Sequence, residues 1–181
     1  DVTNPKAPRQ LSVLWDHKSI VLSVAFSADG KTLASGSKDG TIILWDVTHP
    51  QTPRKLSVLS DHKHPVISLA FSVYGLLASG SCKDDNSSIG VCGPYQAIAS
   101  TRTNDKEGAI IVWDVRDPKS PEGWGRRTDR LGVANSVAFS PDGKRLASLS
   151  DDGTIILWSA DLLLQVKVLS GLTGDVAYSV A

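Results

Sequence analysis

The stretch SVAFSADGKTLASGSKDGTIILWDV occupies residues 23–47 and predicts three short strands joined by two tight turns. It recurs at residues 136–158 as SVAFSPDGKRLASLSDDGTIILW, and in two separated pieces at residues 68–81 and 108–115. Its first three letters return once more at residues 179–181. A fixed period of this size is typical of repeat architectures, in which each copy forms one supersecondary unit.

Each copy predicts four antiparallel strands. In the first copy we expect strands at residues 21–26, 33–36 and 41–45, followed by an outer strand at 54–59. Turns are expected at residues 28–31 and at Asp39-Gly40, where a two-residue type I′ turn needs positive φ at both central positions. The offset between copies is 45 residues at the N-terminus. Four antiparallel strands within such an offset form one blade of a β-propeller.

The copies predict an all-β chain with three complete four-stranded blades. We expect an orphan outer strand at residues 9–14 and an orphan inner strand at 176–181. The outer strand of the second copy is poorly defined, because residues 116–132 form a charged connection with glycine and proline. The expected layout is a linker at 1–10, blade regions at 11–59, 60–130 and 131–169, and the start of another blade at 170–181.

The second copy contains an insertion. Trp113 lies 68 residues after Trp45, whereas Ser79 lies only 44 residues after Ser35, so 24 residues are extra. They fall at about 82–105 and form either a long loop between the second and third strands or a decayed extra hairpin; we favour the loop. Its Asp, Asn, Ser and Gly content fits a mobile excursion, and a long loop on a rigid scaffold is also a candidate binding element.

Composition narrows the class of partner. The formal net charge is zero and the pI is about 7.1, which argues against a general affinity for nucleic acid or anionic membranes. No apolar run approaches the roughly 18 residues that span a bilayer. Two cysteines fit a reducing compartment or an incidental pair. The chain contains no methionine, so we expect a processed piece, a fragment or a sequence with missing ends. We also expect a cytoplasmic protein that uses no cofactor.

The chain resembles the WD-repeat β-propeller family in the segments 39–46, 108–114 and 152–158, which begin at Gly or Asp-Gly and end at Trp or Trp-Asp. The resemblance implies a buried tetrad of His, Ser, Asp and Trp in each blade. The expected members are His17, Ser35, Asp39 and Trp45 in blade one; His62, Ser79 or Ser100, Glu107 or Asp105, and Trp113 in blade two; and Ser148, Asp152 and Trp158 in blade three, where the His position falls near Arg130.

A buried tryptophan explains why such a set would be needed. Its side chain buries roughly 150–250 Å², and its N–H must then find an acceptor. Ser35, His17 and Asp39 also have the residue types of a nucleophilic triad, but a triad is recognised by geometry, and recurrence beside a Trp favours a structural role. His62, His64, Cys82 and Cys92 carry atoms that bind zinc, yet their spacing matches no closed motif, so we expect no metal site.

The resemblance favours a non-catalytic protein–protein interaction scaffold, a segment of a larger propeller whose open blade edges meet another chain or missing repeats. Two alternatives remain open: the sensor propeller of a multidomain enzyme whose catalytic domain is absent here, and a propeller that binds glycans or small ligands. Candidate partner contacts are Trp15, Lys38, Asp84, Asp85 and Tyr95, and a short basic patch is formed by Arg126, Arg127 and Arg130.

Overall fold

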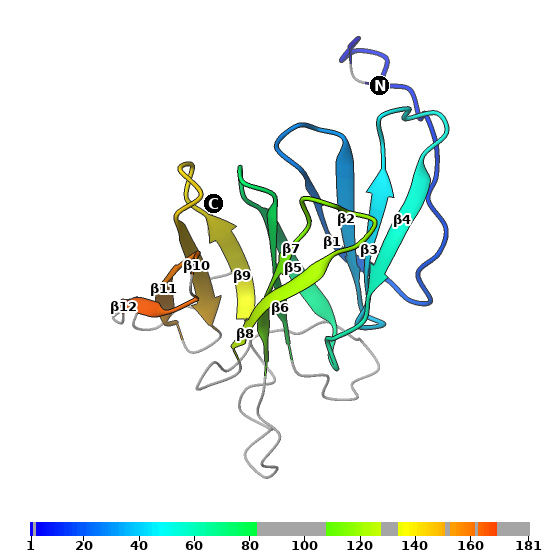
Figure 1. Ribbon diagram of the computed structural model, residues 1–181. Helices are drawn as coiled ribbons and strands as arrows, with labels where there is room; N and C mark the ends of the chain where they lie inside the picture. Colours follow the sequence, from blue (N-terminus) through cyan, green and yellow to red (C-terminus); the bar gives the residue numbers. More distant parts are fainter. Residues whose placement is uncertain (2, 83–107, 128–133, 151–152, 162, 170–181) are drawn as a thin grey trace.

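The computed structural model describes residues 1, 3–82, 108–127, 134–150, 153–161 and 163–169, which form three four-stranded antiparallel sheets (Figure 1). The first sheet contains β1 (Val21–Phe26), β2 (Thr32–Ser37), β3 (Ile42–Asp46) and β4 (Arg54–Leu59); the second contains β5 (Val66–Phe71), β6 (Leu76–Ser81), β7 (Ile110–Asp114) and β8 (Glu122–Arg127); and the third contains β9 (Ala134–Phe139), β10 (Arg145–Ser150), β11 (Ile155–Ser159) and β12 (Gln165–Leu169). The strands of each sheet follow one another in chain order. The prediction of three all-β blades is confirmed. No helix in the described part of the chain is long and apolar enough to cross a membrane.

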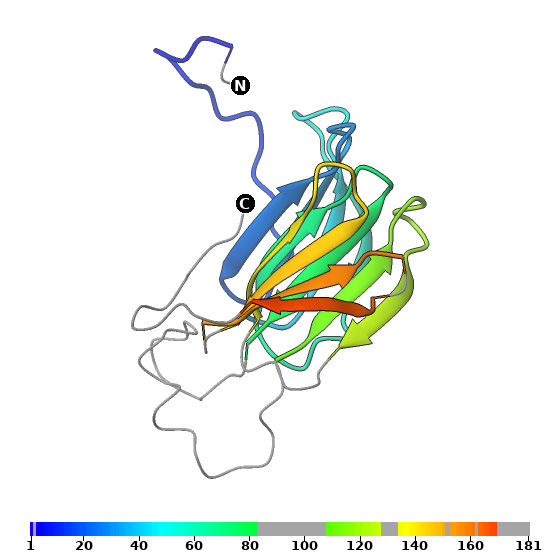
Figure 2. The same ribbon diagram turned by 90° about the vertical axis from the view of Figure 1, so that its left-hand side faces the viewer.

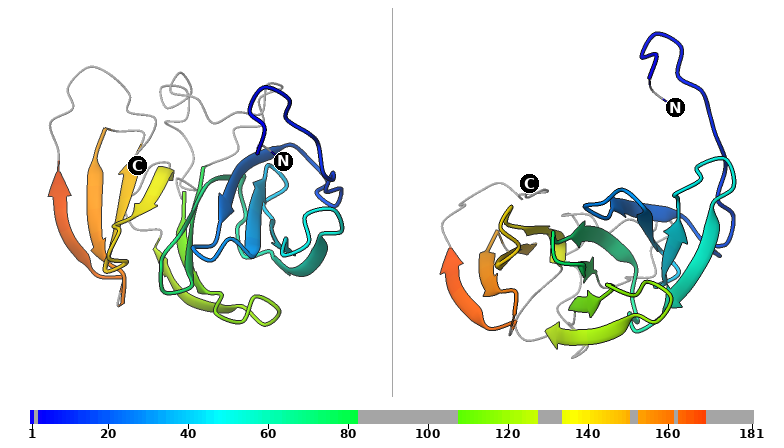
Figure 3. Two further views of the ribbon diagram at one scale, coloured as in Figure 1. Left: turned by 90° about the horizontal axis from the view of Figure 1, so that it is seen from above. Right: turned by 45° about the horizontal axis from the view of Figure 1, so that its top comes forward.

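The blades are arranged along an arc. The inner strands β1, β5 and β9 lie next to one another, and the outer strands β4, β8 and β12 lie away from them (Figure 3). When the molecule is turned by 90° about the vertical axis, the three sheets are seen one behind another (Figure 2). One apolar cluster fills the space between blades one and two, and a second fills the space between blades two and three. Each blade is therefore stabilised mainly by its neighbours, as in other repeat proteins.

Glycine sets the distance between successive blades. Gly36 in β2 and Gly80 in β6 occupy the same register position, opposite the first serine of the SVAFS or SLAFS element. A Cβ at Gly36 would lie 2.7 Å from Val66 Cγ1, and a Cβ at Gly80 would lie 2.7 Å from the Ala134 carbonyl oxygen. The absence of a side chain thus lets the inner strand of the next blade approach. Leu149 occupies this position in blade three.

The hairpin turn between β2 and β3 differs from the prediction. Ser37 N–H donates to Thr41 O at 3.1 Å, so the turn contains three residues rather than two. Within it only Gly40 has positive φ, at +81°, which makes the type I′ expectation wrong. The carboxylate of Asp39 accepts the Thr41 N–H at 2.9 Å and so holds this three-residue turn. A type I turn followed by a left-handed glycine is the usual solution for this loop length.

The expected outer strand at residues 9–14 is wrong. These residues are described and form no strand. In the described chain no neighbouring inner strand pairs with their backbone N–H and C=O groups, and a strand needs such a partner. Instead the segment covers part of the open side of blade one, where it lines a cavity of about 560 Å³ together with Phe26 and Leu33. The orphan inner strand expected at 176–181 lies outside the described residues.

The structure locates two features of blade two that the sequence left open: the position of the extra residues and the outer strand. The extra residues lie between β6 and β7, whose ladder from Leu76↔Asp114 to Gly80↔Ile110 is unbroken. The loop and the decayed hairpin both concern residues outside the described part. The outer strand that the sequence left poorly defined is β8, which pairs with β7 from Ile110↔Arg127 to Asp114↔Glu122 and has a bulge at Trp124. Gly123 and Gly125 weaken the propensity of this strand, but sheet pairing outweighs propensity.

Candidate functional site

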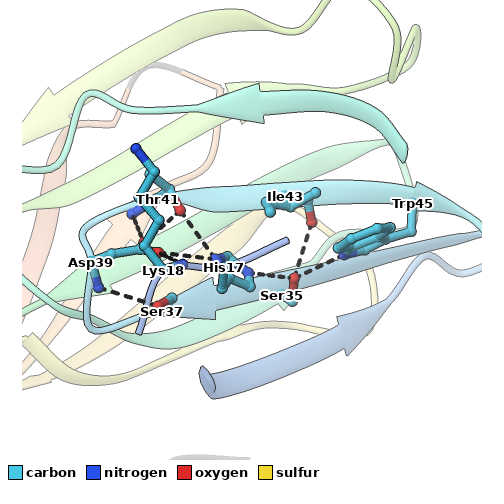
Figure 4. A network of polar contacts seen from close by, with 8 residues as sticks. All are labelled: His17, Lys18, Ser35, Ser37, Asp39, Thr41, Ile43 and Trp45. Atoms are coloured by element: carbon cyan, nitrogen blue, oxygen red, sulfur yellow. Dashed lines mark hydrogen bonds and ion pairs between the residues drawn. The ribbon is translucent and has the colours of Figure 1, made fainter. Parts of the chain in front are cut away.

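The structure brings together the four residues of the tetrad expected in blade one (Figure 4). Trp45 Nε1–H, on β3, donates to Ser35 Oγ on β2 at 2.9 Å. His17 Nε2 lies 2.8 Å from the same Ser35 oxygen, and His17 Nδ1 lies 3.5 Å from Asp39 Oδ2 in the hairpin turn. Trp45 and Ser35 are buried. The chain of contacts therefore runs from the indole to the carboxylate without a gap.

Thr41 is a fifth member that the sequence pattern did not suggest. Its hydroxyl donates to Asp39 Oδ1 at 2.5 Å and lies 3.1 Å from His17 Nδ1. Burial alone would raise the pKa of Asp39, but hydrogen bonds from Thr41 and from the Lys18 N–H hold that pKa below its usual value. The sequence carried a signal for this residue, because Thr follows Asp-Gly both at Thr41 and at Thr154.

Blade two contains the corresponding arrangement around Ser79. Trp113 Nε1–H donates to Ser79 Oγ at 3.1 Å, and His62 Nε2 lies 2.7 Å from that oxygen. Ser79 Oγ in turn donates to the Ile111 carbonyl oxygen at 3.1 Å. His62 Nδ1 is buried and has no hydrogen-bond partner in the structure described. Glu107, Asp105 and Ser100 lie outside the described residues, so the acidic member of this set stays a prediction.

In blade three the described part contains only the serine and the tryptophan. Trp158 Nε1–H donates to Ser148 Oγ at 2.9 Å, and both residues are buried. Asp152 and Arg130 lie outside the described residues. The same Trp-to-Ser hydrogen bond is thus present in all three blades.

These sets are poor candidates for catalysis. A hydroxyl has one proton to donate and two lone pairs. Ser79 directs its proton to Ile111 O, so Trp113 Nε1 and His62 Nε2 both fill its acceptor positions. A nucleophilic serine instead gives its proton to the histidine and keeps its oxygen open to substrate. Ser79 is 0% exposed and saturated, which leaves no position for a substrate atom.

The pKa of His62 follows from its surroundings. Burial lowers this pKa from 6.5 to about 4, and the positive charges of Arg126 and His64 act in the same direction. His62 is therefore neutral in the folded protein at neutral pH. Its Nε2 carries the proton that is donated to Ser79, because the Ser79 hydroxyl proton is directed elsewhere.

Acidification is expected to destabilise the protein through His62. The folded pKa of about 4 lies below the unfolded value, so between pH 6.5 and about 4 the unfolded chain binds a proton that the folded chain does not. This stabilisation is present above pH 6.5 and is lost as the pH falls, with a total of roughly 3 kcal/mol. Urea unfolding at a series of pH values should show the loss, and His62→Gln should flatten it. His49→Gln, which removes an exposed imidazole, serves as the control; an unchanged slope in His62→Gln would contradict the assignment.

The expected partner contacts are only partly within the described residues. Trp15 is 81% exposed and stands in the segment before β1. Lys38 lies in the β2–β3 turn, where its N–H donates to Ile20 O at 2.9 Å. Asp84, Asp85 and Tyr95 lie outside the described residues. The contact role of all five stays a prediction.

The two described arginines of the expected basic patch form hydrogen bonds with backbone carbonyl oxygens. Arg126 donates to the Asp61 carbonyl oxygen at 3.3 Å, and Arg127 Nε donates to the Leu163 carbonyl oxygen at 2.9 Å. Arg130 lies outside the described residues. The two described guanidinium groups thus connect neighbouring segments of the protein, so at least part of their hydrogen-bonding capacity is used internally.

The described residues contain no group of three His, Cys, Asp or Glu side chains that could hold a metal ion. Cys82 is buried and disulfide-bonded, so it offers no thiolate ligand. Cys92 lies outside the described residues. His62 directs Nε2 to Ser79.

Comparison with known proteins agrees with this architecture. A family model described as "WD domain, G-beta repeat" matches residues 8–46 and 128–159. Protein hir1 of Schizosaccharomyces pombe is 29% identical over 166 residues, which cover 91% of this chain and 16% of that protein. Eukaryotic translation initiation factor 3 subunit I of Culex quinquefasciatus is 28% identical over 156 residues, which cover 83% of this chain and 41% of that protein.

A solved structure of U3-55K shows the same fold. It aligns with a TM-score of 0.67 at 22% identity, over 90% of this chain and 42% of that one. The chain thus spans less than half the length of each of these three proteins. Three four-stranded blades, the recurring Trp-to-Ser hydrogen bond and the family match lead to one conclusion: the chain belongs to the WD40-repeat β-propeller family.

Proposed function

We propose that this chain is a non-catalytic platform for protein partners. The observation that carries the proposal is that the two described sets with catalytic composition, around Ser35 and Ser79, already use their hydrogen-bonding groups inside the protein. Ser79 donates one hydrogen bond and accepts two inside the core, and Ser35 accepts the Trp45 indole N–H beside His17. The polar groups of the blades therefore hold the sheets, and recognition is left to exposed loops and edges.

Exposed aromatic side chains support binding of proteins in particular. Trp15, Tyr74 and Trp124 are 81%, 60% and 47% exposed. Tyrosine and tryptophan are enriched at protein interfaces, where they supply a large contact area at a small entropic cost. The name of the similar initiation factor describes a subunit of a larger assembly. A role as one component of a protein assembly is consistent with both.

The proposal is tested by two measurements on the full-length protein purified from its native cells under mild conditions. We expect it to elute in a complex with partner proteins of fixed stoichiometry, identified by mass spectrometry. We also expect a fluorophosphonate probe, which labels activated serines, to leave Ser35 and Ser79 unmodified. A protein that elutes alone and is labelled at either serine would show that the chain is enzymatic.

A further inference from the structure

The inner strand of blade one exposes an apolar face. Val21, Val24 and Phe26 on β1 are 46%, 60% and 62% exposed. In the other two blades the residues at these ladder positions are buried or packed against an inter-blade cluster: Val66, Leu69 and Phe71 in blade two, and Ala134, Val137 and Phe139 in blade three. The preceding blade covers them, because β5 packs against β1 and β2, and β9 packs against β5 and β6. The exposed face of β1 is therefore one half of an interface that the repeat forms twice elsewhere.

The segment before β1 lies on blade one where the outer strand of a preceding blade would lie. Asp1 and Leu11 line the cavity of about 560 Å³ beside blade one. Asp46 and Leu56, which stand 45 residues later, line a cavity of about 500 Å³ between blades one and two. The opposite walls also correspond, and they contain Phe26, Gly30, Val47 and Pro50 in the first cavity and Phe71, Gly75, Val115 and Pro118 in the second.

Asp1 and Arg9 form the first step of the corresponding strand ladder. The Asp1 nitrogen donates to the Arg9 carbonyl oxygen at 2.7 Å, and the Arg9 N–H donates to the Asp1 carbonyl oxygen at 2.9 Å. Such an exchange of two backbone hydrogen bonds is the antiparallel pattern. In blade one the residues 45 positions later, Asp46 and Arg54, are partners in the ladder of β3 and β4. The hairpin between a third and a fourth strand is therefore already closed, although no sheet continues from it in the described chain.

The packing between blades sets one condition on the element that covers β1. Gly36 allows Val66 of the next blade to approach, since a Cβ at Gly36 would lie 2.7 Å from Val66 Cγ1. Val21 has the ladder position of Val66, so the covering sheet needs a glycine at the position of Gly36. Blade three carries Leu149 at this position. The corresponding face of a second copy of this chain therefore does not meet the condition.

We propose that the face of β1 binds a three-stranded antiparallel sheet of the same repeat, with a glycine in its middle strand and a third strand that continues into Asp1. Residues 9–14 then become the fourth strand of this sheet, with Leu11 in the position of Leu56. Burial of the apolar face of β1 provides the driving force. The assignment goes beyond the proposed role as a platform and does not depend on it, because it concerns packing between blades.

The test adds one such sheet to the whole chain. A copy of residues 16–45 is joined directly before Asp1, so that its last residue precedes Asp1 as Trp45 precedes Asp46. Hydrogen exchange followed by mass spectrometry compares the extended chain with the original chain. We expect the peptide that contains residues 10–14 to exchange at least about 10-fold more slowly in the extended chain, because these residues enter a strand ladder.

The matched control is the same extension with leucine in place of the glycine copied from Gly36. This leucine reproduces the situation at Leu149 and should collide with Val21, so exchange at residues 10–14 should slow by less than about 2-fold.

Val24→Thr provides an independent readout of the face itself. In the original chain Val24 is exposed, so the substitution should leave the urea midpoint of unfolding unchanged. In the extended chain the added hydroxyl is buried, so the same substitution should lower the midpoint.

The proposal is overturned if the extension leaves exchange at residues 10–14 unchanged, or if the leucine version protects them equally well. Sedimentation of the original chain tests the other occupant. A dimer in which β1 is protected from exchange would show that a second copy covers this face, and it would also contradict the proposal. None of these results bears on the proposed function, whose failure is seen separately, when the full-length protein elutes without partners.

Discussion

Gly80→Val is expected to destabilise the protein by about 3 kcal/mol, because the new side chain meets a backbone atom that cannot move aside. A Cβ at this position would lie 2.7 Å from the Ala134 carbonyl oxygen on the inner strand of blade three. Overpacking of a core typically costs about 1–3 kcal/mol, and more where the neighbour is rigid. Urea denaturation followed by intrinsic fluorescence should show the shift in midpoint.

Gly123→Ala is the matched control. Gly123 lies on the outer strand β8, where a Cβ would meet no heavy atom within 4 Å, and its φ is not positive. We therefore expect Gly123→Ala to change the free energy of unfolding by no more than about 0.5 kcal/mol. Equal effects of the two substitutions would mean that the blades do not depend on the close approach at Gly80.

Ser79→Ala is expected to cost about 3 kcal/mol. The serine is fully buried, and its oxygen accepts hydrogen bonds from the Trp113 indole and from His62. Removing it leaves two buried donors without an acceptor, and each unsatisfied group costs about 1–3 kcal/mol. The free energy of unfolding from urea titrations measures this loss directly.

Ser12→Ala provides the comparison for this prediction, because Ser12 is exposed in the segment before β1. It should leave stability within about 0.5 kcal/mol of the wild type. If Ser79→Ala cost less than about 1 kcal/mol, the hydrogen bonds around Trp113 would not contribute substantially to the stability of this blade.

Much of the fold could be predicted because the repeat supplies its own comparison. The strands at 21–26 and 54–59 are found with those bounds, and the Trp-to-Ser hydrogen bonds of blades one and three join residue pairs at the same offset of 10. Local pattern determines these elements. It does so because hydrophobic alternation and the Asp-Gly turn point to the same structure.

The sequence pattern does not predict the structure where contacts between separate segments or side chains determine it. Residues 9–14 alternate like a strand but have no sheet to join in the described chain. Asp39-Gly40 suggested a type I′ turn, yet the carboxylate of Asp39 is held by Thr41, which selects a longer turn with a single left-handed residue. Side-chain hydrogen bonds of this kind cannot be inferred from a dipeptide.

A cavity of about 740 Å³ between blades two and three could not be predicted from the sequence, for a different reason. Tyr74 and Trp124 are separated by 50 residues, so nothing local links them. The usable signal was their departure from the repeat, since Asp29 and Leu56 occupy the equivalent positions. Only the packing of blade two against blade three shows that both residues line this cavity, while Tyr74 also lines the cavity between blades one and two.

The central claim is that the Ser, His and Trp sets are closed structural networks. Hydrogen exchange of the five indole N–H groups, followed by NMR of the ¹⁵N-labelled chain, tests it most directly. We expect the indoles of Trp45, Trp113 and Trp158 to exchange only when the protein unfolds, because each donates to a buried serine, while Trp15 exchanges at the rate of a free indole. Exchange of Trp45 and Trp113 as fast as that of Trp15 would show that water reaches these serines and would contradict the structural role.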